Sequence, residues 1–543
     1  MEKQPRLLSS QLLLKNRVFE VTLNRALLTW KEIQTKKKRV YGSIHSTFKV
    51  GFCLSKVLSK PSGESGSYCV PVPEIVAVRE AEADSRTKDE GRWQKLSQKP
   101  TEGYPCAFTV SYVERGRQHR WRCSDVTFHC SDWTLCQQWV QSIREQLLLL
   151  TSRPKHLLVY INPYGGKQQG KLIYEEKVAP LFSRASISTD VIVTEYANHA
   201  RDHLKMEADL KKYDGVVCVG GDGMFSEIVH GLVSRMQADC GVDQNCAEEK
   251  LVPCGIRIGI IPAGSTDCIC YATVGTNDPA TSALHVIVGD YQPLDVCSVH
   301  HNNTFLRYSV SLLGYGFYGD VLADSERKRW MGPARYNFSG VKTFLTHHHY
   351  EGTVSFLPAT DILGNPRDKT KCRAGCYICQ HNGKLLSEEA QLHKMEEPVS
   401  CSEMEGDWRG GSSWSTSRLE LTGPPPPPPP PPLFLQFDLA FVEVHRVRKF
   451  RFSPTQCESD LELDLRGGGA GGGARGGKRL FRQICRDHPA CGCTPVNSSW
   501  NCDGEILPHA TIEVGVHRQL IRLFARGIED QPLFEDFCTP SVI

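Results

Sequence analysis

The sequence contains no window of about 18 apolar residues, the length that a membrane-spanning helix needs. Its first residues, MEKQPRLLSSQLLL, lack the apolar core and the small-residue cleavage site of a secretory signal. It also lacks a large net charge, because its 543 residues carry a formal charge of only +3. We therefore expect no bilayer-spanning segment and no export, and any electrostatic targeting must come from local patches.

The 23 cysteines are scattered along the chain rather than gathered in a short disulfide-rich segment. Without a secretory signal, this distribution predicts a cytosolic protein whose thiols are reduced or bound to metal. The glycosylation sequons at Asn302, Asn337 and Asn497 then have no consequence.

The chain is too long for one core, and its composition separates three regions. Residues 10–150 are basic and rich in strand-like runs, and they end in a helical stretch. Residues 152–291 alternate short β-branched runs with helical stretches, which is typical of βαβ units and a parallel sheet. Residues 292–535 return to runs of the antiparallel kind. The apolar face of the expected helix consists of Leu135, Trp139, Ile143, Leu147 and Leu150.

Strands are expected in four runs of the third region. These runs cover residues 309–319, 352–358, 437–452 and 510–525. Two low-complexity segments interrupt them, residues 403–435 with nine consecutive prolines and the Gly-rich residues 466–478. Polyproline forms a stiff helix and a Gly-rich segment is flexible, so neither is expected to pack in a core.

Three glycine-containing loops follow three of the expected parallel strands. Residues 162–166 follow HLLVYI, residues 220–223 follow GVVCV, and residues 263–267 follow RIGIIP. Glycines let backbone N–H groups approach a bulky anion, and a following helix adds its N-terminal dipole. Because the carboxyl ends of parallel strands lie at one edge of a sheet, the loops predict a nucleotide phosphate site.

Two familiar nucleotide motifs do not fit these loops. The segment GGKQQGKL has the spacing of a P-loop, but Leu172 stands where Ser or Thr must hold Mg²⁺. The segment GDGMFS begins like a dinucleotide fingerprint, but Ser226 replaces its third glycine. Asp222 would also place a carboxylate against a pyrophosphate, which is repulsive unless the carboxylate has another task.

General base catalysis is a task that fits Asp222. A carboxylate beside the γ-phosphate can accept the proton of an attacking hydroxyl, and the flanking glycines leave room for the substrate. The alternative is that this Asp-Gly pair forms an ordinary turn. The two companion loops in the expected order favour catalysis.

The segments NPYGGK, VGGDGMFSE and IPAGSTD, in this order and spacing, resemble the catalytic domain of the diacylglycerol and sphingolipid kinases. Within that family, the sequence is similar to the members that phosphorylate ceramide, from about residue 150 to 380 and again from FVEV onward. The resemblance implies a two-lobed kinase with an α/β nucleotide lobe and a β-sandwich lobe. It also implies that the γ-phosphate of ATP passes to the primary hydroxyl of ceramide, to give ceramide 1-phosphate.

The resemblance assigns roles to residues position by position. Asp222 matches the proton acceptor, and Asp320, in GFYGD, matches the acidic residue that recognises the polar head of a sphingoid lipid. The loop between substrate and phosphate consists of Gly220, Gly221, Asp222 and Gly223. The expected ATP-binding residues are Asn162, Pro163, Tyr164, Gly165, Gly166, Thr194, Glu195, Tyr196, Ala197, Asn198, Glu227, Ser265, Thr266, Arg327, Arg335, Asp503, Gly504 and Glu505.

A divalent metal is implied together with ATP. The sequence shows no tight metal cage made only of protein ligands, so we expect Mg²⁺ to arrive with ATP and to keep several waters. Stimulation by Ca²⁺ belongs to the same expectation.

The N-terminal region resembles a pleckstrin-homology (PH) domain, a strand-rich barrel closed by one helix. A basic hairpin from Arg115 to Arg122 and a basic run are expected to meet anionic lipid headgroups such as phosphoinositides. The run consists of Lys36, Lys37, Lys38 and Arg39. The alternative for such a run is an ordinary solvated loop. Because ceramide is too apolar to travel through water, its kinase must sit on a membrane, and the resemblance points to the Golgi or the plasma membrane.

The resemblance raises two further family traits, a cysteine cluster and calmodulin binding. Cys372, Cys376 and Cys379 resemble a family cluster and are candidate zinc ligands, with three plain thiols in a hairpin as the alternative. Calmodulin binding is attached in the family to a basic amphipathic stretch ahead of FVEV. We do not expect it here, because polyproline occupies that place and HRVRKFRF alternates like a strand.

Two other functions remain open. The chain could be a sibling lipid kinase acting on diacylglycerol or sphingosine, or a catalytically inactive lipid-binding protein on the same scaffold. The presence of Asp222 argues against the inactive scaffold, which would not need it.

The proline tract stands where family members run through several β-strands, and it cannot donate the hydrogen bonds of a ladder. Either the chain is a real splice form that folds poorly and works weakly, or intronic sequence has been translated. We favour the second, because the low-complexity tracts lie where the resemblance fails. Sequencing the transcript across residues 400–440 decides between the two.

Overall fold

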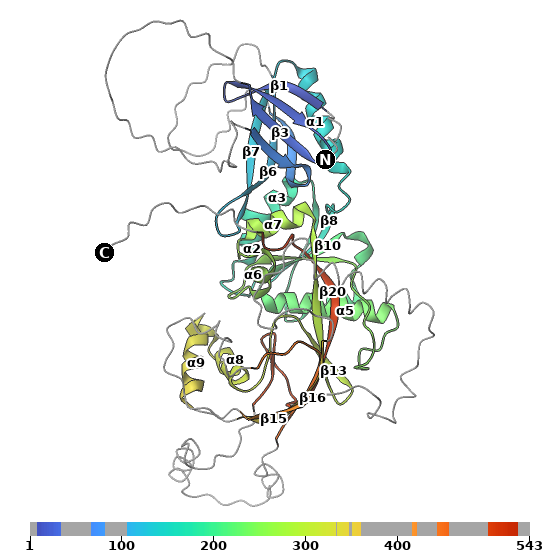
Figure 1. Ribbon diagram of the computed structural model, residues 1–543, viewed down its shortest axis with the longest axis vertical. Coiled ribbons are helices and arrows are strands. Elements are labelled where there is room, and N and C mark those ends of the chain that lie inside the picture. The colour runs from blue at the N-terminus through green and yellow to red at the C-terminus, as the bar shows by residue number, and fades with distance from the viewer. Residues whose placement is uncertain are drawn as a thin grey trace, which may run out of the picture. The chain divides into compact units, whose positions relative to one another are not determined.

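The computed structural model describes eight stretches of the chain (Figure 1). They are residues 8–33, 67–81, 106–332, 334–346, 350–359, 415–420, 443–455 and 498–529. The basic run 36–39, the cysteines at 372, 376 and 379, the proline tract and the Gly-rich segment therefore lie outside the described residues. The chain divides into two compact units, Met1–Pro154 with Leu181–Ile187, and Lys155–Pro180 with Ser188–Ile543.

The first unit is a seven-stranded antiparallel sheet in the order β4-β3-β2-β1-β7-β6-β5, followed by one helix. Its elements are β1 (Leu8–Leu14), β2 (Arg17–Leu23), β3 (Leu27–Glu32), β4 (Ser67–Pro71), β5 (Ile75–Ala81), β6 (Cys106–Arg115), β7 (Trp121–Cys130) and α1 (Trp133–Leu148). The side chain of Asp132 caps α1 by accepting a hydrogen bond from the N–H of Leu135 at 2.7 Å. Trp139 of α1 is fully buried and stacks on Phe108 of the sheet. The expected strand-rich domain with one closing helix is confirmed, although Leu150 lies beyond the end of that helix.

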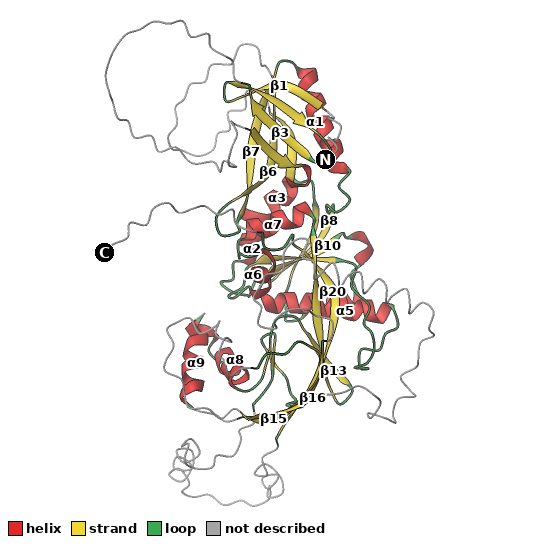
Figure 2. Ribbon diagram, in the orientation of Figure 1, coloured by secondary structure: helices red, strands yellow, loops and turns green. Residues whose placement is uncertain are grey.

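The second unit begins with four parallel strands in the order β11-β10-β8-β9. These are β8 (His156–Ile161), β9 (Ser188–Val193), β10 (Gly215–Gly220) and β11 (Arg257–Pro262). The helices among these strands are α2 (Gly170–Ile173), α3 (Ala179–Arg184), α4 (His199–Met206), α5 (Asp222–Asp239), α6 (Cys268–Val274) and α7 (Pro279–Val288), drawn in red in Figure 2. The boundary between the two units runs through α3, whose residues from Leu181 onward belong to the first unit. The strands β8 and β10 are buried along almost their whole length, as their runs of Leu, Val and Ile require in a sheet covered on both faces. The predicted α/β lobe is confirmed.

Antiparallel strands continue the same sheet. They are β12 (Tyr291–His301), β13 (Thr304–Ser309), β15 (Glu351–Pro358), β16 (Ser415–Glu420), β17 (Val447–Pro454) and β20 (Ile512–Phe524). Strand β20 joins the two parts, because its Arg522 pairs in parallel with Arg257 of β11 while its Val514 pairs antiparallel with Phe450 of β17. The two lobes therefore share one sheet of ten strands, a continuity that the separate runs of the sequence did not predict.

A three-stranded sheet packs against this antiparallel part. It consists of β14 (Leu313–Gly314), β18 (Asn501–Cys502) and β19 (Glu505–Ile506). The core between the layers contains Trp500 and Phe452, whose ring centroids lie 5.3 Å apart, together with Ile512 and Val514. Two helices, α8 (Phe317–Glu326) and α9 (Ala334–Leu345), complete the lobe. None of the helices in the described parts of the chain is long and apolar enough to cross a bilayer.

One strand expectation needs correction. Residues 309–319 do not form one strand, because the chain turns after Ser309, pairs only at Leu313–Gly314, and enters α8 at Phe317. Gly316, with φ +67°, makes this change of direction possible. Residues 415–420, within the low-complexity segment 403–435, form β16 and pair along β15 at the edge of the sheet.

Candidate active site

Three loops meet at one edge of the parallel strands. Residues 162–166 follow β8, residues 220–223 follow β10, and residues 263–267 follow β11. The N–H of Asn162 donates to the carbonyl of Val219, and the N–H of Ala263 donates to that of Gly220, both at 3.0 Å. The strands thus bring together loops that lie up to 100 residues apart in the sequence, as a parallel sheet requires.

Glycines let the three loops approach one another at backbone distance. A Cβ on Gly166, where φ is +56°, would lie 2.4 Å from the carbonyl oxygen of Ala263. A Cβ on Gly264 would lie 2.5 Å from the Cα of Gly221. Gly223 differs, because a Cβ there meets nothing within 4 Å. The glycines at the loop contacts serve packing, and Gly223 faces open space.

Asp222 is the first residue of α5, and its carboxylate reaches across to the third loop. Its Oδ2 accepts a hydrogen bond from the N–H of Cys268 at 3.0 Å, and its Oδ1 accepts one from the N–H of Ile269 at 3.1 Å. These amides begin α6, so the carboxylate caps that helix while remaining half-exposed. A carboxylate has about four lone-pair positions, so two bonds fix its orientation and leave positions that can accept a proton.

Asp267 is a second carboxylate in these loops, and the sequence analysis did not single it out. It has a φ of +53° and only 6% exposure, and its Oδ1 accepts from the N–H of Gly264 at 2.9 Å. The pKa of Asp267 is raised to about 6, chiefly by burial; the hydrogen bond from Gly264 opposes this rise and the charge of Asp222 adds to it. Its neighbours Ser265 and Thr266, which were predicted to bind ATP, lie exposed on the same loop. An Asp directly after two hydroxyl residues in a glycine loop was the available signal.

The first loop is held by its own asparagine. The Oδ1 of Asn162 accepts hydrogen bonds from the N–H groups of Tyr164, at 2.8 Å, and Gly165, at 3.1 Å. Such a turn leaves the Tyr164 side chain 66% exposed at the mouth of the loop. The predicted residues 162–166 therefore form one rigid turn beside the Asp222 loop.

Glu227 of α5 connects the predicted loop 194–198 to the same edge. The backbone of Asn198, which has a φ of +69°, donates a hydrogen bond to the Glu227 carboxylate. Burial raises the pKa of Glu227, against the opposing effects of this bond and of nearby Arg201. Its Oε2 is buried and has no hydrogen-bond partner among the described residues. Thr194 at the start of the loop is buried and donates its N–H to the carbonyl of Ile161 at 2.9 Å.

The segment Asp503-Gly504-Glu505 returns to α5 through an arginine that the sequence analysis missed. Arg307 of β13, only 14% exposed, pairs with Glu505 and donates its Nη2 to the Oγ of Ser226 at 3.3 Å. Ser226 precedes Glu227, and the charge of Glu505 contributes to the raised pKa of Glu227. A lone charged residue in the strand-like run TFLRYS was the available signal.

Asp503 itself has a structural position. Its carboxylate accepts from the N–H groups of Val310 at 2.7 Å, Leu312 at 2.8 Å and Ser311 at 3.0 Å. The hydroxyls of Ser311 and Ser309 donate two further hydrogen bonds to this carboxylate, at 2.8 and 3.3 Å. Asp503 therefore holds the turn between β13 and β14, while Glu505 is the acid of this segment that reaches α5.

Asp320 lies in the first turn of α8, where two hydroxyl groups hold its carboxylate. The hydroxyl of Tyr350 donates to Oδ2 at 2.7 Å, and that of Ser498 donates to Oδ1 at 2.5 Å. Burial and the bond to Asp320 together raise the pKa of Tyr350. A carboxylate held by two neutral donors has a defined direction, which suits recognition of a polar head.

The arginines predicted to contact ATP are placed differently. Arg335 of α9 is 13% exposed and pairs with Glu326 at 3.4 Å and with the hydroxyl of Tyr336 at 2.7 Å. Arg327, just after α8, is exposed. Among the described hydrogen bonds and ion pairs, none joins either arginine to the loops around Asp222.

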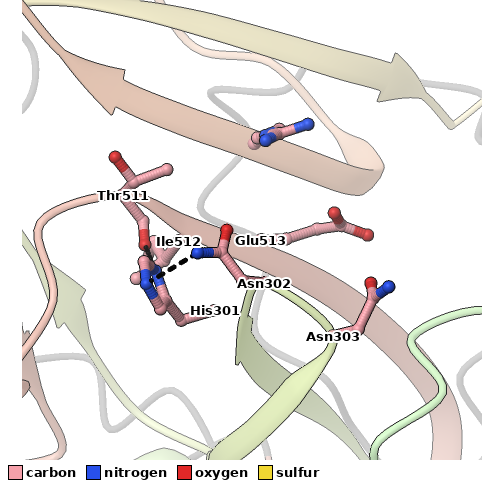
Figure 3. Close-up of a pocket in the computed structure, with 7 residues that line it drawn as sticks. His301, Asn302, Asn303, Thr511, Ile512 and Glu513 are labelled. Atoms are coloured by element: carbon pink, nitrogen blue, oxygen red, sulfur yellow. Dashed lines mark hydrogen bonds between the residues drawn. The ribbon is translucent and has the colours of Figure 1, made fainter.

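A polar cavity of about 290 Å³ lies elsewhere, around the turn between β12 and β13 (Figure 3). The Nδ1 of His301 donates to the carbonyl of Thr511 at 2.7 Å, and Asn302 donates its side-chain amide to Nε2 at 3.1 Å. Both ring nitrogens are thus occupied, and the residues that line this cavity include none of the predicted site.

Comparisons with known proteins agree with this architecture. Residues 8–143 match the family model of the ceramide kinase PH domain, and residues 156–299 match that of the diacylglycerol kinase catalytic domain. Human ceramide kinase is 52% identical over 85% of this chain and 89% of its own length, and mouse ceramide kinase is 48% identical over 87% and 92%. Ceramide kinase of Arabidopsis thaliana is 31% identical over 75% of this chain and 79% of its own length. A solved diacylglycerol kinase of Bacillus anthracis, at 12% identity, covers 68% of this chain and 97% of its own, with a TM-score of 0.36.

A PH domain followed by this catalytic domain, with glycine loops around a carboxylate, defines an ATP-dependent lipid kinase. The chain belongs to the ceramide kinase family. The family expected from the three loop motifs is thereby confirmed.

Proposed function

We propose that this chain transfers the γ-phosphate of ATP to the primary hydroxyl of ceramide, giving ceramide 1-phosphate. The observation that carries the proposal is the position of Asp222. Its carboxylate is oriented by two backbone amides at the edge where the glycine loops meet, and it is half-exposed beside the open space at Gly223. The similarity to ceramide kinases supports the choice of acceptor.

Asp222 would act as the general base. The acceptor hydroxyl donates its proton to a lone pair of the carboxylate that is not engaged by Cys268 or Ile269, while its oxygen attacks phosphorus. The bonds to the two amides prevent the carboxylate from rotating away, so the proton acceptor is already in place when substrate binds. Gly223 leaves room for the phosphate and the lipid headgroup to reach it.

ATP phosphates would lie against the backbone of the three loops, whose N–H groups and helix ends favour an anion. Residues 162–166 and 194–198 would bind the rest of the nucleotide, with Ser265 and Thr266 nearby. Arg307 supplies a cation at the first turns of α5, next to Glu505. Arg327 and Arg335 belong to the predicted set, and their contribution requires a movement of the α8–α9 region toward the loops.

The residues at this edge fit a divalent metal. Mg²⁺ prefers carboxylate oxygens and phosphate, and the buried Oε2 of Glu227 lacks a partner among the described residues. Glu227 and Glu505 would hold the ion together with the nucleotide. Bound Mg²⁺ would neutralise charge on the phosphate oxygens. Stimulation by Ca²⁺ remains part of the proposal.

The lipid acceptor would be recognised by Asp320. The hydroxyls of Tyr350 and Ser498 fix its carboxylate, which can then accept a hydrogen bond from an amide or hydroxyl of the lipid headgroup. Diacylglycerol lacks the amide of ceramide, and sphingosine carries an amine instead. Discrimination among the three lipids should therefore depend on this acid.

The PH domain would place the enzyme on a membrane. Arg117, Arg120 and Arg122 are exposed in and beside the β6–β7 turn. Arg115 is different, because it pairs with the buried Glu74 at 2.7 Å and lies over the ring of Trp121. We infer peripheral association through the exposed arginines, with phosphoinositides as the anionic partner and the Golgi or plasma membrane as the location. The run Lys36 to Arg39 would add to this surface.

Radiolabelled ATP with ceramide, diacylglycerol or sphingosine in mixed micelles tests the proposal, with Asp222→Asn as the blank. We expect label in ceramide, with at most a small fraction in the other two lipids. Label in diacylglycerol or sphingosine instead would establish the sibling activity. No label in any lipid, from a chain that binds ATP and unfolds cooperatively, would establish an inactive lipid-binding protein.

We further infer that the chain divides into three domains, residues 10–150, 152–291 and 292–535. We also infer that a chain expressed with residues 403–435 is only weakly active. Removing residues 421–435, which contain the proline tract, would then raise thermal stability and turnover together.

A further inference from the structure

Helix α9 presents its large apolar side chains outward. Its buried residues are Ser339, Gly340 and Thr343, which are small or polar. Phe338, Val341 and Leu345 are 51%, 51% and 67% exposed. A helix that packs only on its own core has the opposite arrangement, with large apolar residues inside.

Polar contacts hold the inner face of α9 against α8. The hydroxyl of Ser339 and the ammonium of Lys342 donate to the carboxylate of Asp324, both at 2.7 Å, and Lys328 pairs with the same acid. Burial alone would raise the pKa of Asp324, but these bonds lower it well below its usual value. The attachment of α9 therefore rests mainly on polar contacts; Phe338 contributes through the Lys328 ammonium, which lies 5.2 Å from the centre of its ring. Val341 and Leu345 are exposed and available to another surface.

The connection between α8 and α9 adds an aromatic residue and positive charge. Trp330 is 83% exposed. Residues 327–345 contain five basic residues and no acidic one; the basic residues are Arg327, Lys328, Arg329, Arg335 and Lys342. The two helices lie beside each other in Figure 1, so these groups border one helical pair.

We propose that the outer face of α9, with Trp330, is a docking surface for an anionic lipid bilayer. Tryptophan and phenylalanine partition to the depth of the headgroups, and valine and leucine reach the acyl boundary. Lys328 and Lys342 pair with Asp324, and Arg335 pairs with Glu326, while Arg327 is exposed. Residues 320–345 together contain five basic and three acidic residues, so the helical pair keeps a net positive charge that complements the negative surface of such a bilayer.

Docking at this place has a consequence for the lipid substrate, and that part rests on the proposed function. Asp320 lies in the first turn of α8, the helix against which α9 packs. A bilayer that holds α9 thus brings its headgroup layer to the element that carries the proposed acceptor-recognition residue. The docking itself requires no assumption about which lipid is phosphorylated.

Sedimentation of the full chain with vesicles tests the surface. The variant carries Val341→Gln and Leu345→Gln, and the vesicles contain phosphatidylcholine with one part in four phosphatidylserine. We expect at least about tenfold weaker binding than for the native chain, because two apolar anchors are lost. Met206→Gln, on the 74% exposed Met206 of α4, is the matched control and should bind like the native chain. Added salt should weaken binding of the native chain to these vesicles.

Equal sedimentation of the native chain and the double variant would overturn the proposal. So would equal losses in the double variant and in Met206→Gln, since any exposed apolar side chain would then serve. If the double variant melts at a lower temperature yet sediments like the native chain, the face is covered by another part of the chain and the proposal fails. Turnover on a water-dispersed short-chain ceramide, measured in parallel, should be the same in all three proteins and reports on the proposed function independently of sedimentation.

Discussion

The loop around Asp222 and the turn around Asp503 have similar sequences and opposite arrangements. Both are Asp-Gly pairs followed by a glutamate within a few residues. Both residues are half-exposed, but Asp222 accepts two backbone hydrogen bonds, whereas Asp503 accepts from three backbone amides and two hydroxyls. A carboxylate can act as a base only where lone pairs remain accessible. We therefore expect the same pair of residues to take part in chemistry at Asp222 and to hold a turn at Asp503.

The largest difference is expected when each aspartate becomes asparagine. Asp222→Asn should lower turnover at least about 100-fold, because the amide cannot accept the proton, while ATP affinity stays near native. One of the two backbone bonds is lost, so the free energy of unfolding should fall by only about 1 kcal/mol. Turnover on ceramide micelles and equilibrium ATP binding measure the two parts. Near-native turnover would remove Asp222 from the mechanism.

The glycine after each aspartate sharpens the contrast. Gly223→Asp should inactivate the enzyme by placing a second carboxylate beside the phosphates, yet leave thermal stability near native, because a Cβ at Gly223 meets no atom within 4 Å. Gly504→Ala should act in the opposite way and lose roughly 1–2 kcal/mol of stability, since φ is +95° there. Turnover and thermal unfolding of both variants decide the matter. Full activity of Gly223→Asp would show that this loop does not face the phosphates.

Asp503→Asn should mainly lower the free energy of unfolding. An amide nitrogen cannot accept, so at least one of the backbone donors at residues 310–312 is left without a partner, at a cost of about 2–3 kcal/mol. Urea unfolding measures this loss. The control is Asp295→Asn, at an exposed carboxylate that accepts a backbone hydrogen bond from Gln519 at 2.7 Å and should therefore lose less stability. Unchanged stability combined with weaker ATP binding would instead place Asp503 in the nucleotide site.

The smallest effect concerns the pH dependence of Asp267. Its pKa rises from 3.8 in the unfolded chain to about 6 in the fold, chiefly through burial. The unfolded chain therefore ionises first, and the stability associated with this group, present below pH 3.8, is lost as the pH rises to about 6. Asp267→Asn keeps the oxygen that accepts from Gly264 and removes the titration. Relative to the native chain, it should gain about 1–2 kcal/mol between pH 4 and pH 7. A pH-independent difference between the two unfolding free energies would contradict the assignment.

The sequence alone determined the class of the protein and much of the edge where the loops meet. The spacing and composition of the apolar runs predicted the parallel strands, because short β-branched runs that alternate with helical stretches fit few other structures. The order of the glycine loops pointed to Asp222 as the candidate base. It also identified the closing helix of the first unit from the spacing of Trp139 and Ile143. These are local properties of the chain, so they can be predicted from the sequence.

Only the tertiary structure decided which polar groups meet. The positions of Asp267 and Arg307 depend on packing between segments distant in sequence, so neither carries a local signal strong enough to identify it. Strand β20 joins the two lobes because one part of it pairs with β11 and another part pairs with β17. The thirteen residues of this strand cannot specify both partners by themselves. The division of labour between Asp222 and Asp503 has the same cause, since hydrogen-bond partners are fixed by the fold and not by the Asp-Gly pair. The outward apolar face of α9 likewise depends on the fold, because the carboxylate of Asp324 in α8 holds the opposite face of the helix through Ser339 and Lys342.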